Sequence, residues 1–133
     1  MDYYAGLDVS LRSCALCIVD EKGSVRLERE LPCEIEAIAG ALADFPNPVA
    51  RVGFEAGTMS QHLYFGLRDR GFDVVCMEAR QVNAALSAMR NKTDRNDARG
   101  IAQVLRTGWF SPVHMKSRES RGVRALLSTR RAL

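Results

Sequence analysis

Four acidic residues have the types and spacing needed to act together on a phosphate group. Asp8 and Glu55 each end a short apolar run, in the segments "GLDVS" and "FEAGT". Asp94 and Asp97 lie three residues apart in "NKTDRNDA", which puts both on one face of a helix. Mg²⁺ and Mn²⁺ prefer carboxylate oxygens as ligands, and two such ions about 3.5–4 Å apart can promote phosphoryl transfer. We therefore interpret these acids as candidate catalytic and metal-binding residues for phosphodiester chemistry.

Each acid, taken alone, also has a simpler interpretation. Asp8 could start a turn, and Glu55 could be a single solvated acid. Asp94 could be a charge that the dipole of a helix N-terminus favours, and Asp97 could form ion pairs with neighbouring cations. Like charges within ~4–6 Å raise each other's pKa and oppose ionisation, so a cluster of four acids needs cations. The occurrence of all four together favours the metal site.

The cations are concentrated in the C-terminal third of the chain. Residues 1–89 hold 8 Lys/Arg and 13 Asp/Glu, a net charge of −5, whereas residues 90–133 hold 11 and 3, a net charge of +8. This asymmetry favours a polyanionic partner, although a solvated helix face is the alternative for the tail. The candidate nucleic-acid-binding residues are Lys92, Arg95, Arg99, Lys116, Arg118, Arg121 and Arg124.

Length and composition favour one soluble domain. The chain has 133 residues, of which 47% are hydrophobic and 26% are charged. No apolar run approaches the roughly 20 residues of a membrane span, and no signal peptide is evident, so we expect a cytoplasmic protein. Cys14 and Cys17 have C-x-x-C spacing, but residues three apart in a strand point to opposite faces. We interpret them, with Cys33 and Cys76, as reduced thiols and not as metal ligands.

The elements that would position the acids follow the order β-β-β-α-β-α-β-α-α. Strands are predicted at residues 3–8, 13–20, 25–31, 49–55 and 72–77, and helices at 34–45, 59–70, 79–89 and 94–106, with a further candidate at 117–133. Three antiparallel strands followed by helical crossovers give a mixed sheet with helices on both faces. This order matches the ribonuclease-H-like topology.

Parallel pairing would bring the first two acids together. If strands 3–8 and 49–55 are neighbours, Asp8 and Glu55 meet at the carboxyl edge of the sheet. A helix capped by Thr93 and ended by Gly108 would add the second acidic pair. Trp109 and Phe110 are expected to anchor the end of that helix in the core.

The three acidic motifs together resemble the N-terminal domain of the IS110-family transposases, called DEDD transposases after their four acids. The string K-T-D-x-x-D-A is the most specific part, and the likeness spans nearly the whole chain. It implies a RuvC-like fold with Asp8, Glu55, Asp94 and Asp97 as catalytic and metal-binding acids. It also implies a prokaryotic, nucleoid-associated oligomer that uses Mg²⁺ or Mn²⁺ to cut and rejoin DNA, guided in some members by a structured RNA.

The resemblance sets the expected domain organisation. We expect a catalytic domain at residues 1–110 and a basic helical connector at 111–133, which leads towards an absent C-terminal transposase domain. That domain supplies a serine nucleophile in the family, so we expect this chain to be incomplete as a recombinase. Two alternatives stay open: a stand-alone Holliday-junction-type nuclease, and a non-catalytic nucleic-acid-binding or dimerisation fragment. A sugar-kinase-like ATPase is disfavoured because "DVSLRS" lacks a phosphate-loop glycine.

Overall fold

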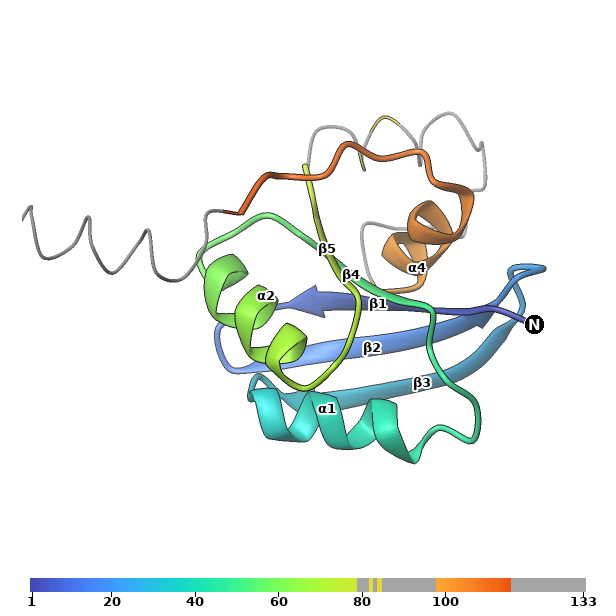
Figure 1. The fold of residues 1–133 in the computed structure, drawn as a ribbon, viewed down its shortest axis with the longest axis horizontal. Coiled ribbons are helices and arrows are strands. Elements are labelled where there is room, and N and C mark those ends of the chain that lie inside the picture. Colours follow the sequence, from blue (N-terminus) through green and yellow to red (C-terminus); the bar gives the residue numbers. More distant parts are fainter. Residues whose placement is uncertain (79–81, 83, 85–97, 116–133) are drawn as a thin grey trace, which may run out of the picture.

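A mixed five-stranded sheet is the frame of the protein (Figure 1). The computed structural model describes residues 1–78, 82, 84 and 98–115. The strands are β1 (Tyr3–Val9), β2 (Ser13–Asp20), β3 (Val25–Pro32), β4 (Arg51–Glu55) and β5 (Val74–Met77). The helices are α1 (Ile35–Asp44), α2 (Ser60–Asp69) and α4 (Ala98–Thr107). The helices predicted at 79–89 and 117–133 lie outside the described residues, apart from positions 82 and 84.

The strand order is β3-β2-β1-β4-β5, as expected for the predicted topology. Strands β1 to β3 pair antiparallel, whereas β4 pairs parallel with β1 and β5 pairs parallel with β4. Where a predicted element lies wholly within the described residues, each of its ends falls within two residues of the observed end. The prediction of antiparallel strands followed by parallel strands is therefore confirmed.

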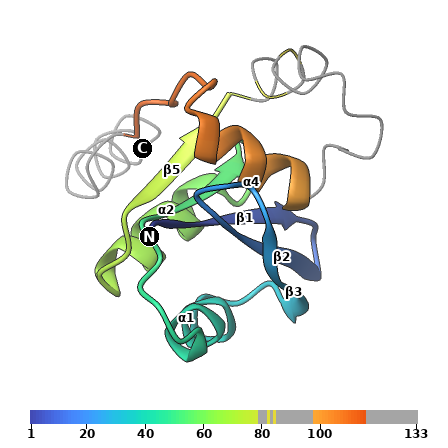
Figure 2. The same ribbon diagram turned by 90° about the vertical axis from the view of Figure 1, so that its right-hand side faces the viewer.

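Helices cover both faces of the sheet (Figure 2). Helices α1 and α2 pack on one face, where Leu7 of β1 joins Ile38 of α1 and Leu63 of α2 in the main core. Helix α4 packs on the other face, where its Ile101 joins Met77 of β5 in a second cluster. Since side chains alternate along a strand, the odd-numbered residues of β1 face α1 and α2, and its even-numbered residues face α4.

Gly6 lets α4 lie directly on β1. A Cβ atom at position 6 would come within 2.5 Å of both the backbone nitrogen of Ala102 and the carbonyl oxygen of Ala98. Further along the helix, Leu105 fills the space above Gly53 of β4. Helix α4 thus crosses from β1 to β4, and the backbone of Ala98 and Ala102 lies directly over Gly6.

The cysteines of β2 confirm the expected alternation. Cys14 is buried in the core under α1 and α2, whereas Cys17 is buried with Ala98 and Ala102 under α4. All four cysteines are free thiols. Burial, with smaller contributions from Cys33 and Asp8, raises the pKa of Cys14 to about 11. Cys14 and Cys17 therefore face opposite sides of the sheet and cannot share one metal ion.

The segment after α4 covers the outer edge of β5. Gly108, with a φ of 80°, follows the helix as predicted. The amide of Glu78 then donates to the carbonyl of Ser111 at 3.0 Å, and the amide of Val113 donates to the carbonyl of Cys76 at 2.8 Å. The hydrogen bonds of Ser111 and Val113 show that the chain still pairs with the sheet beyond residue 110. The predicted boundary between a domain at 1–110 and a connector at 111–133 stays a prediction. No helix within the described part of the chain is long and apolar enough to span a bilayer.

The predicted anchoring role is wrong for Trp109, which is 55% exposed. Phe110 is partly buried against the α4 cluster instead. The helix closes at Gly108, whose amide donates to the carbonyl of Val104 at 3.0 Å, and the chain then turns towards β5. One aromatic residue is enough to cover the end of the cluster at this turn.

Candidate active site

Asp8 and Glu55 lie beside each other at the carboxyl ends of two parallel strands. In the register of β1 and β4, Leu7 faces Phe54, so the next residue on each strand is one of the two acids. Leu7 and Phe54 point into the core under α1 and α2, which directs both acids to the face that carries α4. The structure thus brings together two predicted site residues from distant parts of the sequence.

A pocket of about 250 Å³ opens beside the two acids. Its walls come from the end of β1 and the turn after it, from the end of β4 and the segment that leads into α2, and from α4. The lining residues are Leu7, Asp8, Val9, Ser10, Leu11, Phe54, Glu55, Ala56, Gly57, Thr58, Met59, Ser60, Leu63 and Ile101. This position, outside the carboxyl ends of parallel strands, is where open α/β sheets bind ligands.

Glu55 carries a buried oxygen that needs a partner. Its Oε1 atom is buried and has no hydrogen-bond partner among the described residues. Burial raises the pKa of Glu55, and the carboxylate of Asp8 raises it further. A buried, unpaired polar atom costs roughly 1–3 kcal/mol. A divalent cation would satisfy this oxygen and neutralise the repulsion between the two acids, so the pair fits a hard metal ion.

Two of the four predicted acids are described in this site. Asp94 and Asp97 lie outside the described residues. So do most of the predicted nucleic-acid-binding residues: Lys92, Arg95, Lys116, Arg118, Arg121 and Arg124. Within residues 1–78, 82, 84 and 98–115, no group of three or more His, Cys, Asp or Glu side chains could hold a metal ion.

Arg99 lies in the first turn of α4 and contacts β3. Its Nε and Nη2 atoms donate to Oε1 of Glu28 at 3.0 and 2.8 Å. Both side chains are about half exposed, so the pair contributes little to the stability of the fold. The predicted contact of Arg99 with nucleic acid stays a prediction.

Two residues that shape the site were not predicted as functional. Ile101 is fully buried and forms part of the pocket wall, and Gly6 gives α4 its close approach to β1. A signal for Gly6 was present, because the glycine is part of the motif "GLDVS" that marks Asp8. Ile101 is one apolar residue among several in α4, and nothing in its sequence context distinguishes it.

Changing Glu55 to Gln should stabilise the metal-free domain at neutral pH. The pKa of Glu55 in the folded state lies above its ordinary value of 4.5, so the folded state binds its proton more tightly than the unfolded state. The stability that this proton provides is therefore lost as the pH rises through the raised pKa. Gln has no proton to lose. The melting temperature of the Glu55→Gln variant in EDTA should therefore depend less on pH than that of the wild type.

Thermal unfolding between about pH 4 and pH 8, in the presence of EDTA, measures this difference. Asp73→Asn is a suitable control, because Asp73 is an exposed acid that lies outside the pocket and pairs with Arg51 at 3.3 Å. Parallel pH profiles for the wild type and Glu55→Gln would contradict the prediction.

Comparison with known proteins confirms the RuvC-like fold. The structure of RuvC from Thermus thermophilus in complex with a Holliday junction substrate matches with a TM-score of 0.59 at 14% identity, and the match covers 85% of this chain and 100% of that chain. A second structure of the Thermus thermophilus RuvC matches with a TM-score of 0.58 at 14% identity, and covers 84% and 99% of the two chains. At this identity the likeness shows the fold alone.

The comparison of sequences identifies the family. No curated protein matched the chain. A family model for the DEDD transposases of the IS110 type, described as a transposase, matches residues 5–133, which is almost the whole chain. This match includes both acids of the pocket and the segment that holds the second acidic pair. The chain therefore belongs to the IS110-type family of DEDD transposases.

Proposed function

We propose that this protein is the metal-dependent catalytic domain of a DEDD transposase, which cleaves DNA phosphodiester bonds and takes part in strand transfer. The observation that carries the proposal is the pair of acids at the pocket, with an unpartnered buried oxygen on Glu55. Membership of the transposase family supplies the reaction class. The RuvC-like fold supports it, because that fold holds these two acids on neighbouring strands.

We assign Asp94 and Asp97 as the other two acids of the site. Helix α4 lies on the sheet face to which Asp8 points, and its first residue, Ala98, packs on Gly6. Asp97 directly precedes Ala98 in the chain. This proximity in sequence to the start of α4 supports the assignment, as does the family motif that contains both acids.

In this proposal the four acids together bind a cation and orient a phosphate. A bound Mg²⁺ or Mn²⁺ ion supplies Lewis-acid stabilisation of the charge that develops on the phosphate. Asp8 and Glu55 would provide oxygen ligands for such an ion from the ends of two neighbouring strands. Burial and the carboxylate of Asp8 raise the pKa of Glu55, and a cation held by the pair would favour its ionised form. Ile101 and Phe54 give the pocket apolar lining.

The basic C-terminal third supplies the contacts to the polyanionic partner. Residues 90–133 carry a net charge of +8, and each lysine or arginine that contacts a phosphate adds salt-sensitive affinity. We assign this role to Lys92, Arg95, Arg99 and the basic residues of the tail. The partner is DNA, joined in the active assembly by a structured guide RNA and by further copies of the protein, in the cytoplasm at the nucleoid.

Titration of Mn²⁺ into the protein, followed by calorimetry, tests the proposed ligands. The wild type should bind, and Asp94→Asn and Asp97→Asn should each bind at least about tenfold more weakly, because each removes a charged oxygen ligand. Asp73→Asn, which changes an exposed acid paired with Arg51, should bind like the wild type. Unchanged affinity in both Asp94→Asn and Asp97→Asn would remove the assignment of these two acids.

A stand-alone Holliday-junction nuclease is the second candidate function. The structural match covers 100% of a RuvC chain solved with a Holliday junction substrate, so this chain contains a fold of the same extent. Incubation with a four-way DNA junction and Mn²⁺ separates the two candidates. A nuclease of this kind would cut the junction without any further domain, whereas a transposase domain would leave it uncut. Salt-sensitive DNA binding that survives Asp8→Ala, with no cleavage, would indicate a binding module.

A further inference from the structure

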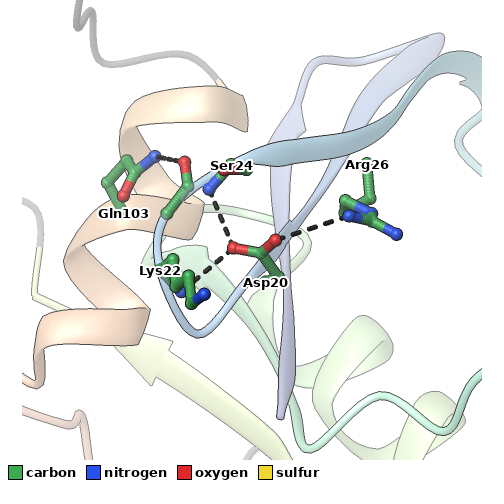
Figure 3. Close-up of polar contacts among 6 residues, drawn as sticks. Asp20, Lys22, Ser24, Arg26 and Gln103 are labelled. Atoms are coloured by element: carbon green, nitrogen blue, oxygen red, sulfur yellow. Dashed lines mark hydrogen bonds and ion pairs between the residues drawn. The ribbon is translucent and has the colours of Figure 1, made fainter. Parts of the chain in front are cut away.

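Asp20 forms polar contacts across the turn between β2 and β3 (Figure 3). Oδ1 of Asp20 accepts hydrogen bonds from the amides of Ser24 at 2.9 Å and Lys22 at 3.0 Å. Its Oδ2 atom lies 3.6 Å from the guanidinium of Arg26. Asp20 is 3% exposed, and Gly23 has a φ of 88°, which favours glycine. The turn therefore presents the carbonyl of Gly23 in a fixed direction.

Gln103 of α4 binds this carbonyl (Figure 3). Its Nε2 atom donates to the carbonyl oxygen of Gly23 at 2.7 Å, and its Oε1 atom accepts from Nε of Arg106 at 3.0 Å. Arg106 also donates from Nη1 to the carbonyl of Glu21 at 3.4 Å. A Cβ atom at position 23 would lie 3.0 Å from Oε1 of Gln103, so the turn and the helix are in close contact. Both ends of the Gln103 amide are thus satisfied between the turn and the helix.

The apolar contacts under α4 differ along the sheet. On β1 the helix rests on Gly6 through Ala98 and Ala102, which offer no long side chains that interlock with the strand, while Ile101 and Leu105 are buried in the cluster that includes Met77 of β5. Apolar burial is non-directional, whereas a hydrogen bond is restricted in both distance and angle. The bonds from Gln103 and Arg106 to the turn therefore supply a directional restraint that the small-residue contact lacks.

We propose that Gln103 is a positioning residue, and that its bond to the Gly23 carbonyl holds α4 in the register that its first turn and Ile101 need beside Asp8 and Glu55. This inference rests on the proposed function, in which the acids just before Ala98 complete the site. A shift of the helix by one residue moves it by about 1.5 Å. Misplacement by about 1 Å can lower a reaction rate by about 100-fold, so a restraint distant from the chemistry has a large effect.

The test compares Gln103→Met with Thr107→Ala. Methionine has a similar length but cannot donate to Gly23, whereas Thr107 bonds to the carbonyl of Val104 within the same helix. We expect Gln103→Met to bind Mn²⁺ about tenfold more weakly than the wild type in calorimetry. Amide hydrogen exchange in residues 98–105 should be faster, while circular dichroism shows a folded protein. Thr107→Ala should match the wild type in affinity and exchange.

A second variant approaches the same contact from the turn. Asp20→Ala removes the acceptor of two backbone amides and so frees the Gly23 carbonyl without any change in α4. It should weaken Mn²⁺ binding as Gln103→Met does, and the double variant should be no weaker than the weaker single variant, because both act through one contact.

The outcomes separate this inference from the proposed function. If the wild type binds Mn²⁺ but Gln103→Met and Asp20→Ala bind equally well, Gln103 does not position the site. Fully additive losses in the double variant would also overturn the inference, because the two residues would then act independently. If the wild type binds no Mn²⁺, or Asp8→Asn binds as the wild type does, the proposed function fails, and the positioning role fails with it.

Discussion

Asp8→Asn should lower the rate of metal-dependent DNA cleavage by about a thousandfold. The change keeps the shape of the side chain but removes one of the two charged ligands that the pocket presents at the ends of β1 and β4. The loss of about 4 kcal/mol of transition-state stabilisation corresponds to a factor of this size, and metal ions contribute several kcal/mol to such reactions. Mn²⁺ affinity should fall in parallel.

The measurement compares cleavage rates of a linear duplex DNA substrate at saturating Mn²⁺, together with calorimetric titration of the metal. Asp73→Asn serves as the matched control. Asp73 lies before β5, and its carbonyl accepts from the amide of Val52 at 2.9 Å, near the opposite end of the sheet. If isolated domain preparations show no cleavage, the titration alone still decides whether Asp8 is a ligand. A variant with wild-type affinity and rate would show that the acids at the pocket do not bind the metal.

Gly6→Ala should destabilise the fold by about 1–3 kcal/mol, the usual cost of forcing extra atoms into a packed interior. The new Cβ atom would meet the backbone of α4 at 2.5 Å, and a helix backbone cannot rotate away as a side chain can. This is a large part of the roughly 5–15 kcal/mol that stabilises a typical domain. Because α4 must lift from β1, Mn²⁺ binding should weaken as well. Urea denaturation gives the change in the free energy of unfolding.

Gly40→Ala is the matched control for this prediction. Gly40 lies on the exposed side of α1, and a Cβ atom there would meet nothing within 4 Å. Alanine is favoured over glycine in a helix interior by about 0.5–1 kcal/mol, so this variant should be more stable than the wild type. Changes of opposite sign in the free energy of unfolding of Gly6→Ala and Gly40→Ala would show that the close approach of α4 causes the loss of stability at position 6. Equal changes would argue against this cause.

The sheet could be predicted from local patterns, because alternation and turn residues mark its strands. The segment "EKGS" between β2 and β3 indicates a hairpin, and the apolar run in β5 indicates a buried parallel strand. The parallel pairing of β1 with β4 could be predicted only by comparison with a known topology, since no local pattern specifies which distant strands pair. The apolar ring of Trp109 predicts burial, but the chain turns at Gly108 and leaves this residue exposed.

The site could be predicted in part for the same reason. Asp8 and Glu55 each end a strand, and this position is visible in the sequence. The burial of Oε1 of Glu55 is not visible, because it depends on walls supplied by the segment before α2 and by Ile101 of α4. The contact between Gln103 and Gly23 spans 80 positions and depends on the path of α4, so spacing in the sequence cannot reveal it.

The pairing of β1 with β4 also limits how related sequences can vary in length. Because side chains alternate along a strand, one residue inserted between Gly6 and Asp8 would send the acid into the apolar layer beside Leu7. The same insertion in the segment 46–50, before β4, would change a connection and leave the alternation intact. Alignment gaps among homologues should therefore fall in such connections, and the interval from the glycine to the acid should stay constant.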